Sequence, residues 1–148
     1  MENRISKDTY YLEIAKAVCL RATCLRRKYG AVIVNNDEIV STGYNGACRG
    51  EESCLDLGVC KREELKIPKG ERYELCRSVH AEQNAIISAS RRDMIGAAIY
   101  IYGIDVKTGE SADPSPCMLC RRFIKNAGIA RCVGYLNGEI TEINLSEG

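Results

Sequence analysis

The stretch "GAVIVNNDEIVSTGYNG", residues 30–46, predicts two strands joined by a tight turn. β-Branched residues lie on both sides of the polar triplet Asn35-Asn36-Asp37, which is typical of a short hairpin turn. Because the strands of a hairpin pair antiparallel, this stretch provides the start of a β-sheet.

Helical spacing precedes the hairpin and returns after it. Upstream, apolar residues recur at three- and four-residue steps, which predicts a helix from about Ser6 to Cys24 with Ser6 or Asp8 as its N-cap. Downstream, "SVHAEQNAIISASRR", residues 78–92, resumes this spacing, and its two final arginines suit a helix C-terminus.

A third helix and three further strands complete the pattern. "SPCMLCRRFIKNAG", residues 115–128, is predicted as a helix with Pro116 at its start and Gly128 as its stop. Short apolar stretches predict strands at 97–103, 130–136 and 139–145, the last two joined by a turn at Asn137-Gly138. Helices that follow strands predict an α/β fold of three α/β/α layers, with a mixed five-stranded sheet covered by helices on both faces.

Length and charge limit the possible functions. The 148 residues suit a single domain, residues 1–148. The 21 lysines and arginines nearly cancel the 20 aspartates and glutamates, so no overall field attracts a nucleic acid or an anionic membrane. No apolar stretch is long enough to span a membrane, and the N-terminus lacks a signal-peptide pattern, so we expect a cytoplasmic protein.

The composition is unusual in its nine cysteines. Disulfides are rare in a reducing compartment, so metal binding is the better explanation for cysteines that cluster. Cys19 and Cys132 lie in apolar stretches and are predicted to be ordinary buried residues. The aperiodic, charged segment at about 47–78 holds four more, and so long a loop requires something to hold it together. These four are Cys48, Cys54, Cys60 and Cys76.

Two short motifs carry the chemistry: His80-Ala81-Glu82 and Pro116-Cys117-Met118-Leu119-Cys120. One histidine and two cysteines can bind zinc and leave one position open for a water molecule, as in catalytic zinc sites. Glu82 can reach the same site only if the motif straddles a helix start, and there it could move the protons of that water. Each motif alone is weak evidence, but together they match the H-x-E…P-C-x-x-C signature of zinc-dependent nucleobase deaminases.

The sequence resembles the cytidine and deoxycytidylate deaminase superfamily, and within it the deoxycytidylate (dCMP) deaminases. The resemblance rests on "CLRRKYGAVIV", "STGYNGA", "HAEQNAI" and "PCMLCRRFIKNAGI". Cytidine deaminases usually have cysteine at the position of His80, whereas tRNA adenosine deaminases have small residues in place of Arg121 and Arg122. The resemblance therefore implies a cytidine-deaminase-like domain that hydrolyses dCMP to dUMP and ammonia. The dUMP would then be used for thymidylate synthesis.

The resemblance also implies a role for individual residues. His80, Cys117 and Cys120 would bind the catalytic zinc, and Glu82 would be the proton shuttle. Substrate contacts would come from the side chain of Asn45, the N–H of Ala81, the carbonyl of Ser115, and Arg26 at the phosphate. For Arg26, an ordinary solvated arginine at a helix end is nearly as good an interpretation.

A second, structural zinc is implied at Cys24, Cys54, Cys60 and Cys76, giving one catalytic and one structural zinc per chain. Cys48 could replace one of these ligands, although a free thiol fits better. Relatives of this branch are often hexamers regulated by dCTP and dTTP, which implies a homo-oligomer. Two alternatives stay open: a deaminase of another cytosine compound or of a base in RNA, and a non-catalytic module stabilised by zinc.

Overall fold

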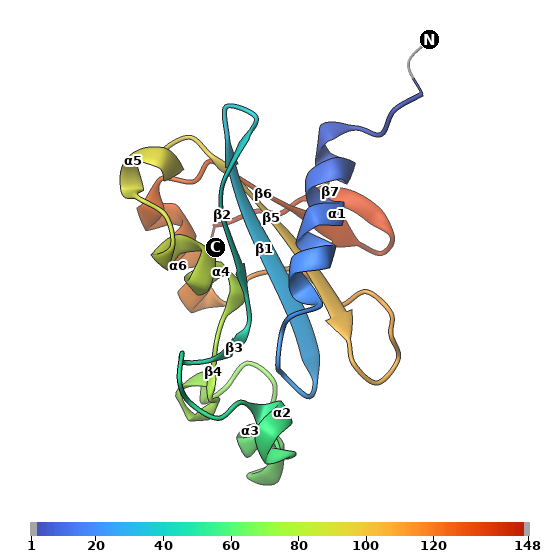
Figure 1. Cartoon of the computed structure of the whole chain (residues 1–148), viewed down its shortest axis with the longest axis vertical. Coiled ribbons are helices and arrows are strands. Elements are labelled where there is room, and N and C mark those ends of the chain that lie inside the picture. The colour runs from blue at the N-terminus through green and yellow to red at the C-terminus, as the bar shows by residue number, and fades with distance from the viewer. Residues whose placement is uncertain (1–2, 147–148) are drawn as a thin grey trace.

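A five-stranded sheet forms the centre of the protein, whose computed structural model describes residues 3–146 (Figure 1). The strand order is β2-β1-β5-β6-β7. Only β5 and β6 pair in parallel; every other neighbouring pair of this sheet is antiparallel, so the predicted mixed sheet is confirmed. The strands are β1 (Arg27–Asn35), β2 (Glu38–Tyr44), β5 (Ala98–Asp105), β6 (Arg131–Leu136) and β7 (Glu139–Glu142).

Both predicted tight turns are present. Asn36 and Asp37 have φ values of 51° and 60°, and Asn137 and Gly138 have 54° and 81°. Two consecutive positive φ values define the type I′ turn, whose twist matches that of the strands it joins. Asparagine, aspartate and glycine tolerate this conformation best, which is why the sequence reveals these turns.

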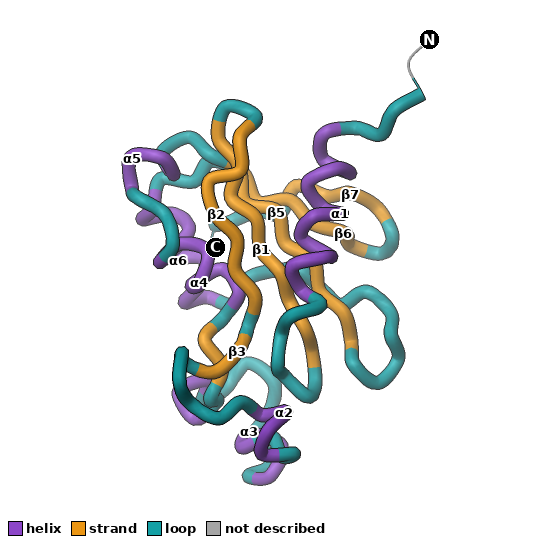
Figure 2. The backbone as a smooth tube through the Cα atoms, in the orientation of Figure 1, coloured by secondary structure: helices purple, strands orange, loops and turns teal. Residues whose placement is uncertain are grey.

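Helices cover both faces of the sheet (Figure 2). Along β1, Val32 and Val34 pack with α1 (Lys7–Cys19), whereas Ala31 and Ile33 pack in the opposite cluster with α4 (Ala81–Ile87) and α6 (Met118–Ala127). This alternation follows from the two-residue period of a strand, which buries both faces when helices lie on each. The three-layer α/β/α prediction is confirmed.

Three predicted helix boundaries are wrong. Helix α1 is capped by Ser6, whose hydroxyl accepts a hydrogen bond from the N–H of Thr9 at 3.1 Å, but it ends at Cys19 instead of Cys24. After Cys19 the backbone forms tighter turns and leaves the helix, and the N–H of Thr23 then donates to the carbonyl of Asn45 at 3.1 Å.

The other two boundaries differ because serine and cysteine start new helices. Helix α4 ends at Ile87, and the two arginines expected to close it belong instead to α5 (Arg91–Met94), which begins after the capping residue Ser90. Helix α6 begins at Met118 because Cys117 is its N-cap, so Pro116 precedes the helix; its stop at Gly128 is confirmed.

The cysteine-rich segment is more ordered than its aperiodic sequence predicts. It contains β3 (Gly46–Ala47), α2 (Cys54–Leu57), α3 (Lys61–Glu64), the 3-10 turn η1 (Tyr73–Leu75) and β4 (Ser78–Val79). Strands β3 and β4 pair with each other, and the helical pieces lie beyond them at the lower end of the molecule in Figure 1. No helix within residues 3–146 is long and apolar enough to cross a membrane.

Candidate active site

His80 lies at the start of α4, where the chain changes from strand to helix. It is the N-cap, with extended backbone angles of φ −70° and ψ 153°, and its N–H donates to the side chain of Gln83 at 3.0 Å. The helix begins at Ala81, so His80 and Glu82 are separated by a change of backbone conformation and can face one site. The expectation that this motif straddles a helix start is confirmed.

Cys117 and Cys120 occupy the start of α6. Cys117 is its N-cap, and its sulfur accepts a hydrogen bond from the N–H of Cys120 at 3.5 Å. A helix start favours thiolate, because its free N–H groups and the helix dipole stabilise negative charge.

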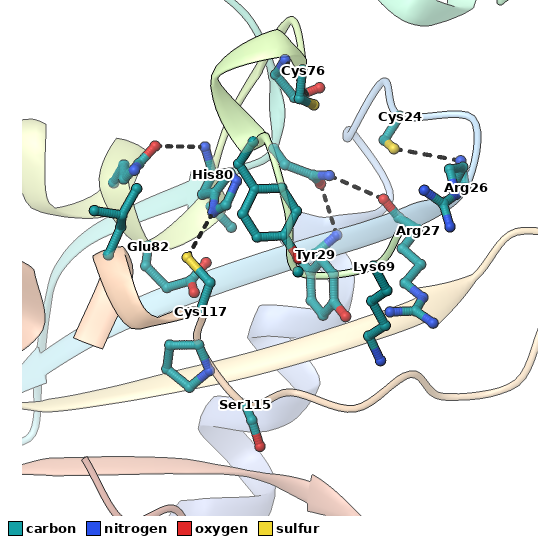
Figure 3. A pocket seen from close by; sticks show the side chains of 18 of the residues that line it. Cys24, Arg26, Arg27, Tyr29, Lys69, Cys76, His80, Glu82, Ser115 and Cys117 are labelled. Carbon is teal, nitrogen blue, oxygen red and sulfur yellow. Dashed lines mark hydrogen bonds between the residues drawn. The ribbon is translucent and has the colours of Figure 1, made fainter. Parts of the chain in front are cut away.

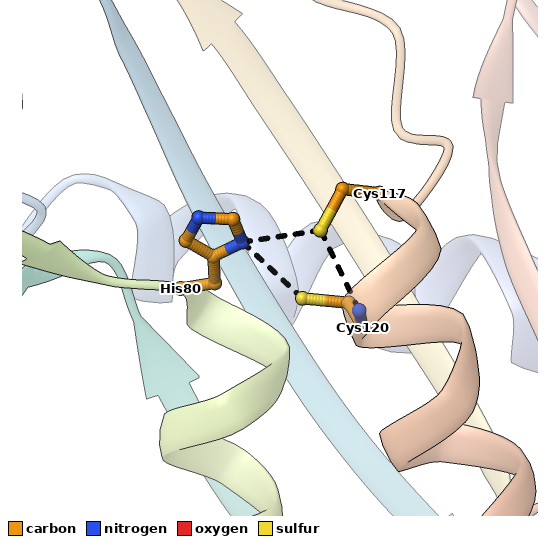
Figure 4. A group of neighbouring side chains, drawn as sticks. All are labelled: His80, Cys117 and Cys120. Carbon is orange, nitrogen blue, oxygen red and sulfur yellow. Dashed lines mark hydrogen bonds between the residues drawn. The ribbon is translucent and has the colours of Figure 1, made fainter. Parts of the chain in front are cut away.

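The structure brings these three residues together in a geometry that fits zinc (Figure 4). Nδ1 of His80 is 3.2 Å from the sulfur of Cys120 and 3.7 Å from the sulfur of Cys117. Zn–N bonds of about 2.0–2.1 Å and Zn–S bonds of about 2.3 Å at tetrahedral angles place nitrogen and sulfur about 3.6 Å apart. Within residues 3–146, this is the one group of three or more histidine, cysteine, aspartate or glutamate side chains whose possible ligand atoms all lie within 4.8 Å of one another.

The thiols of the two cysteines are strongly coupled. The hydrogen bond from Cys120 and the contact with His80 together lower the pKa of Cys117 to about 4, against the effect of burial. The same contact between the thiols, together with burial, raises the pKa of Cys120. Cys117 is therefore the thiolate and Cys120 keeps its proton, which the binding of a divalent cation would displace.

Glu82 is the buried carboxylate of the site. Its side chain is 7% exposed, and burial raises its pKa, although the positive charge of His80 acts in the opposite direction. A carboxyl group with a raised pKa can both take and return protons near neutral pH.

His80, Glu82 and Cys117 line a cavity of about 910 Å³. This volume is at the upper end of the range for small-molecule sites. All four residues predicted to contact the substrate line it: Asn45, Ala81, Ser115 and Arg26. Figure 3 labels Arg26 and Ser115 among them. The cavity is therefore large enough for a nucleotide, and all four residues predicted for its recognition line it.

Asn45 is already held by the backbone of β1. Its side-chain oxygen accepts from the N–H of Tyr29 at 2.8 Å, and its side-chain nitrogen donates to the carbonyl of Arg27 at 3.0 Å. The amide has a second N–H, which leaves one donor for a ligand.

Arg26 also has a partner, since its guanidinium lies 3.0 Å from the carboxylate of Glu63. Ser115 follows buried Pro114, and its N–H donates to the side chain of Asp113 at 2.9 Å.

Sequence reasoning missed several residues of the cavity, among them the buried Arg62, which is only 6% exposed. Its guanidinium donates to the carbonyls of Pro68 and Glu71 and lies 4.5 Å from the ring centre of Tyr73. That ring in turn meets the ring of His80 edge-on, at 5.5 Å between centroids. No periodic signal marks these positions, because they come from the aperiodic segment.

The four cysteines predicted to bind a second zinc lie near one another. Their sulfurs do not all lie within 4.8 Å of one another, however, as the ligand atoms of His80, Cys117 and Cys120 do. Burial raises the pKa of Cys54, and the charges of Cys24, Cys76 and Cys60 raise it further, so all four form one electrostatic neighbourhood. The sulfurs of Cys24 and Cys76 each accept an N–H two residues on, at 3.4 Å. Cys48 is exposed, and Cys19 and Cys132 are fully buried, as predicted.

Comparison with known proteins identifies the family to which the chain belongs. Residues 5–136 match the family described as "Cytidine and deoxycytidylate deaminase zinc-binding region". The chain is 37% identical over 131 residues to a deoxycytidylate deaminase of Mycobacterium phage D29, covering 85% of this chain and 91% of that protein.

Two other similarities concern a longer relative and a solved structure. A deoxycytidylate deaminase of Schizosaccharomyces pombe is 32% identical over 130 residues, covering 88% of this chain but only 37% of that protein. The apo crystal structure of a dCMP deaminase from cyanophage S-TIM5 has a TM-score of 0.61 at 24% identity, covering 93% of this chain and 89% of that one. The solved structure supports the fold, and the two sequences support the family.

Proposed function

The chain belongs to the cytidine and deoxycytidylate deaminase family, and we propose that it catalyses the hydrolytic deamination of dCMP to dUMP and ammonia. One observation carries this proposal: the buried carboxylate of Glu82 lies beside a group of one histidine and two cysteines with zinc-binding geometry. A purely structural zinc site needs no carboxylate beside an open ligand position.

Three residues would hold the metal: His80 through Nδ1, and Cys117 and Cys120 through their sulfurs. When bound, zinc supplies a Lewis acid that makes water acidic enough to provide a nucleophile at neutral pH. Glu82 would accept one proton of the attacking water and pass it to N3 of the pyrimidine. It would then take the second proton, from the hydroxyl formed at C4, and give it to the amine, which leaves as ammonia while the C4 carbonyl forms.

The remaining predicted contacts orient the substrate. Ala81 is the first residue of α4, so its N–H has no partner within the helix and can donate to the pyrimidine carbonyl. The carbonyl of Ser115 would accept from the exocyclic amine, and the free N–H of Asn45 would contact the sugar. Arg26 stays the contact predicted from the resemblance for the phosphate.

The alternatives differ in substrate or in having none. Nothing in the overall charge favours a polymeric RNA substrate, since the formal net charge is +1. A non-catalytic zinc module leaves the buried Glu82 without a purpose.

An ammonia-release assay on dCMP, CMP, deoxycytidine and dCTP tests this function. Zinc-loaded protein should turn over dCMP with the highest kcat/KM, and Glu82→Gln should lose activity while keeping its zinc. Absence of turnover with every cytosine compound would refute the proposal, and turnover of deoxycytidine alone would redirect it to a nucleoside.

We also propose the second zinc, bound by Cys24, Cys54, Cys60 and Cys76. Its support is the shared electrostatic neighbourhood of the four thiols and the need to hold a segment made of very short elements. Metal analysis should give two zinc ions per chain, falling to one in Cys60→Ser and staying at two in Cys48→Ser. One zinc in the unmodified protein would contradict the proposal.

Three expectations stay predictions from the resemblance: supply of dUMP to thymidylate synthesis, regulation by dCTP and dTTP, and a hexameric assembly. The cytoplasmic location stays a prediction from the sequence. Light scattering with and without each nucleotide measures the assembly and its response.

A further inference from the structure

Tyr73 of the cysteine-rich segment lies against His80. Their ring centroids are 5.5 Å apart and their ring planes meet at 82°, which is the edge-to-face arrangement that aromatic pairs favour. Both residues line the cavity, and Tyr73 reaches it from the 3-10 turn η1. The contact therefore joins the cysteine-rich segment to one member of the group that could hold a metal ion.

The ring of Tyr73 is itself held by Arg62. The guanidinium carbon of Arg62 lies over this ring, 4.5 Å from its centre, within the range of a cation–π contact. Arg62 is buried, and its guanidinium donates to the carbonyls of Pro68 at 2.8 Å and Glu71 at 3.0 Å. Arg62 therefore fixes the ring of Tyr73 in relation to the loop that precedes it.

The backbone before Tyr73 also shows that this ring is held in place. Arg72 has a left-handed conformation, with φ 51° and ψ 44°. A residue other than glycine is strained in this conformation, which persists only where the surrounding contacts hold it. The contacts of the Tyr73 ring with Arg62 and His80 are contacts of this kind.

The imidazole of His80 is fixed by hydrogen bonds on one side only. Its Nδ1 faces the sulfurs of Cys120 and Cys117, at 3.2 Å and 3.7 Å (Figure 4). Its Nε2 has no hydrogen-bond partner within residues 3–146. A histidine that binds a metal through one ring nitrogen usually donates the other N–H to a carboxylate, a carbonyl or water, which fixes the ring. Here the edge-on ring of Tyr73 is the neighbour that restricts rotation of the imidazole.

We propose that Tyr73, held by Arg62, is a positioning residue for His80: it fixes the plane of the imidazole so that Nδ1 stays directed at the sulfurs of Cys117 and Cys120. The inference rests on the proposed function, because it assumes that His80 binds zinc. It gives the cysteine-rich segment a part in the reaction beyond lining the cavity, since the order of this segment then affects the geometry of one ligand.

The ring of Tyr73 carries this role, and its hydroxyl does not. Within residues 3–146, this hydroxyl has no hydrogen-bond partner, whereas the hydroxyls of Tyr29 and Tyr100 donate to Asp113 and Asp8 at 2.8 Å and 2.6 Å. Phenylalanine at position 73 keeps the ring, and leucine removes it. Tyr73→Phe should therefore behave like the unmodified protein in every test in which Tyr73→Leu does not.

Nuclear magnetic resonance of the imidazole tests the proposal directly, because His80 is the only histidine of the chain. The zinc-loaded protein and Tyr73→Phe should each give one sharp set of imidazole resonances. Tyr73→Leu should give broadened or doubled resonances, because its imidazole can take more than one orientation. A merely structural role of Tyr73 would lower the melting temperature and leave these resonances sharp.

The same resonances measure the zinc affinity of this group alone, separately from any zinc in the cysteine-rich segment. A chelator titration follows their change from the bound to the free positions. We expect Tyr73→Leu to weaken the affinity about tenfold, the loss typical of removing a group that orients a metal ligand. Tyr73→Phe should stay within about threefold of the unmodified protein.

A double-mutant cycle tests the part of Arg62 and provides a milder variant, in which the Tyr73 ring stays in place. Arg62→Gln should weaken the zinc affinity about threefold, as expected for the loss of one cation–π contact. This loss should disappear in a Tyr73→Leu background, because the ring through which Arg62 acts is absent there. Equal losses in both backgrounds would show that Arg62 does not act through Tyr73.

Tyr135→Leu is the matched control. Tyr135 forms a similar edge-on pair with Tyr102, at 5.8 Å and 86°, but both rings pack in the cluster on the α1 face of the sheet. This variant should lower the melting temperature without changing the resonances of His80 or its zinc affinity.

None of these measurements needs turnover of dCMP, so they decide the inference even if the protein deaminates no cytosine compound. Sharp His80 resonances and an undiminished zinc affinity in Tyr73→Leu would overturn it. So would equal losses in Tyr73→Phe or Tyr135→Leu. If the resonances of the unmodified protein do not respond to zinc, His80 is not a ligand and both the inference and the proposed function fail.

Discussion

Replacing Gly43 by alanine should damage the active site from the opposite side of α4. Gly43 is a buried residue of β2, and the backbone of α4 crosses directly over it. A Cβ atom at this position would lie 2.4 Å from the carbonyl oxygen of Ala81 and 2.4 Å from the nitrogen of Ala85. Both contacts are with helix backbone, which no side-chain rotation can relieve.

The size of the effect follows from these distances. Ordinary contact begins at 3.4 Å, so α4 must move by about 1 Å relative to β2. This movement also strains the hydrogen bond from Ser41 to the carbonyl of Ala85, at 2.7 Å, and the one from Asn84 to the carbonyl of Tyr44, at 2.8 Å. Overpacking of this kind lowers the free energy of unfolding by about 1–3 kcal/mol.

The effect on activity should be larger than the effect on stability, because His80 and Glu82 both lie at the start of α4. Misplacement of a reacting group by about 1 Å costs on the order of a hundredfold in rate. We therefore expect kcat/KM for dCMP to fall about a hundredfold at a temperature where the variant remains folded, with a weaker affinity for zinc measured by chelator competition.

Gly30→Ala is the matched control. Its Cβ would lie 2.2 Å from the carbonyl oxygen of Ala15 and 2.5 Å from the nitrogen of Cys19, both in α1 on the opposite face of the sheet. It should lower the melting temperature as Gly43→Ala does but leave kcat/KM within about threefold. The reasoning is refuted if both variants lose activity equally, or if Gly43→Ala keeps full activity and zinc affinity.

Three further predictions concern other contacts. Burial raises the pKa of Tyr29 and Tyr100 to about 12, and a hydrogen bond to Asp37 does the same for Tyr11, so absorbance at 295 nm should show three tyrosines ionising near pH 12. Because these folded-state pKa values lie above the unfolded value, their stabilisation is complete below pH 10 and lost as the pH rises towards 12, which urea unfolding at several alkaline pH values measures. Asn45→Ala breaks both hydrogen bonds to β1 and should lower the free energy of unfolding by about 2–4 kcal/mol in the same assay, whereas an effect below about 0.5 kcal/mol would contradict this role. Gly103→Ala would place a Cβ 2.3 Å from the ring of Tyr29, and should reduce the affinity for dCMP measured by calorimetry more than the zinc content.

The parts of the fold that the sequence predicts are those governed by local chemistry. The two type I′ turns need residues that tolerate positive φ, and Asn36, Asp37, Asn137 and Gly138 provide them. The group that could hold a metal ion is equally local, because His80, Cys117 and Cys120 belong to two short motifs at helix starts.

The errors arise where a distant partner competes with local preference. Apolar spacing continues past Cys19 to Ala22, which is 2% exposed, yet the helix stops because Thr23 bonds to the backbone of Asn45. That partner lies on the far side of the hairpin, so the spacing alone could not reveal it. Likewise, Ser90 was hidden within a helical pattern, although its side chain accepts from the N–H of Asp93 and starts a new helix.

The part of the cavity that the cysteine-rich segment forms could not be predicted for the same reason, and in this it differs from the part around His80 and Glu82. The catalytic half depends on helix starts packed against the sheet, with Ala81, Ala85 and Ile124 in the same buried cluster. The rest of the cavity depends on the register of β1, which places Tyr29, and on the cysteine-rich segment, which provides Arg62 and Tyr73. Loss of order in that segment should therefore weaken the binding of dCMP before it disturbs the two cysteines of the group that could hold a metal ion, Cys117 and Cys120.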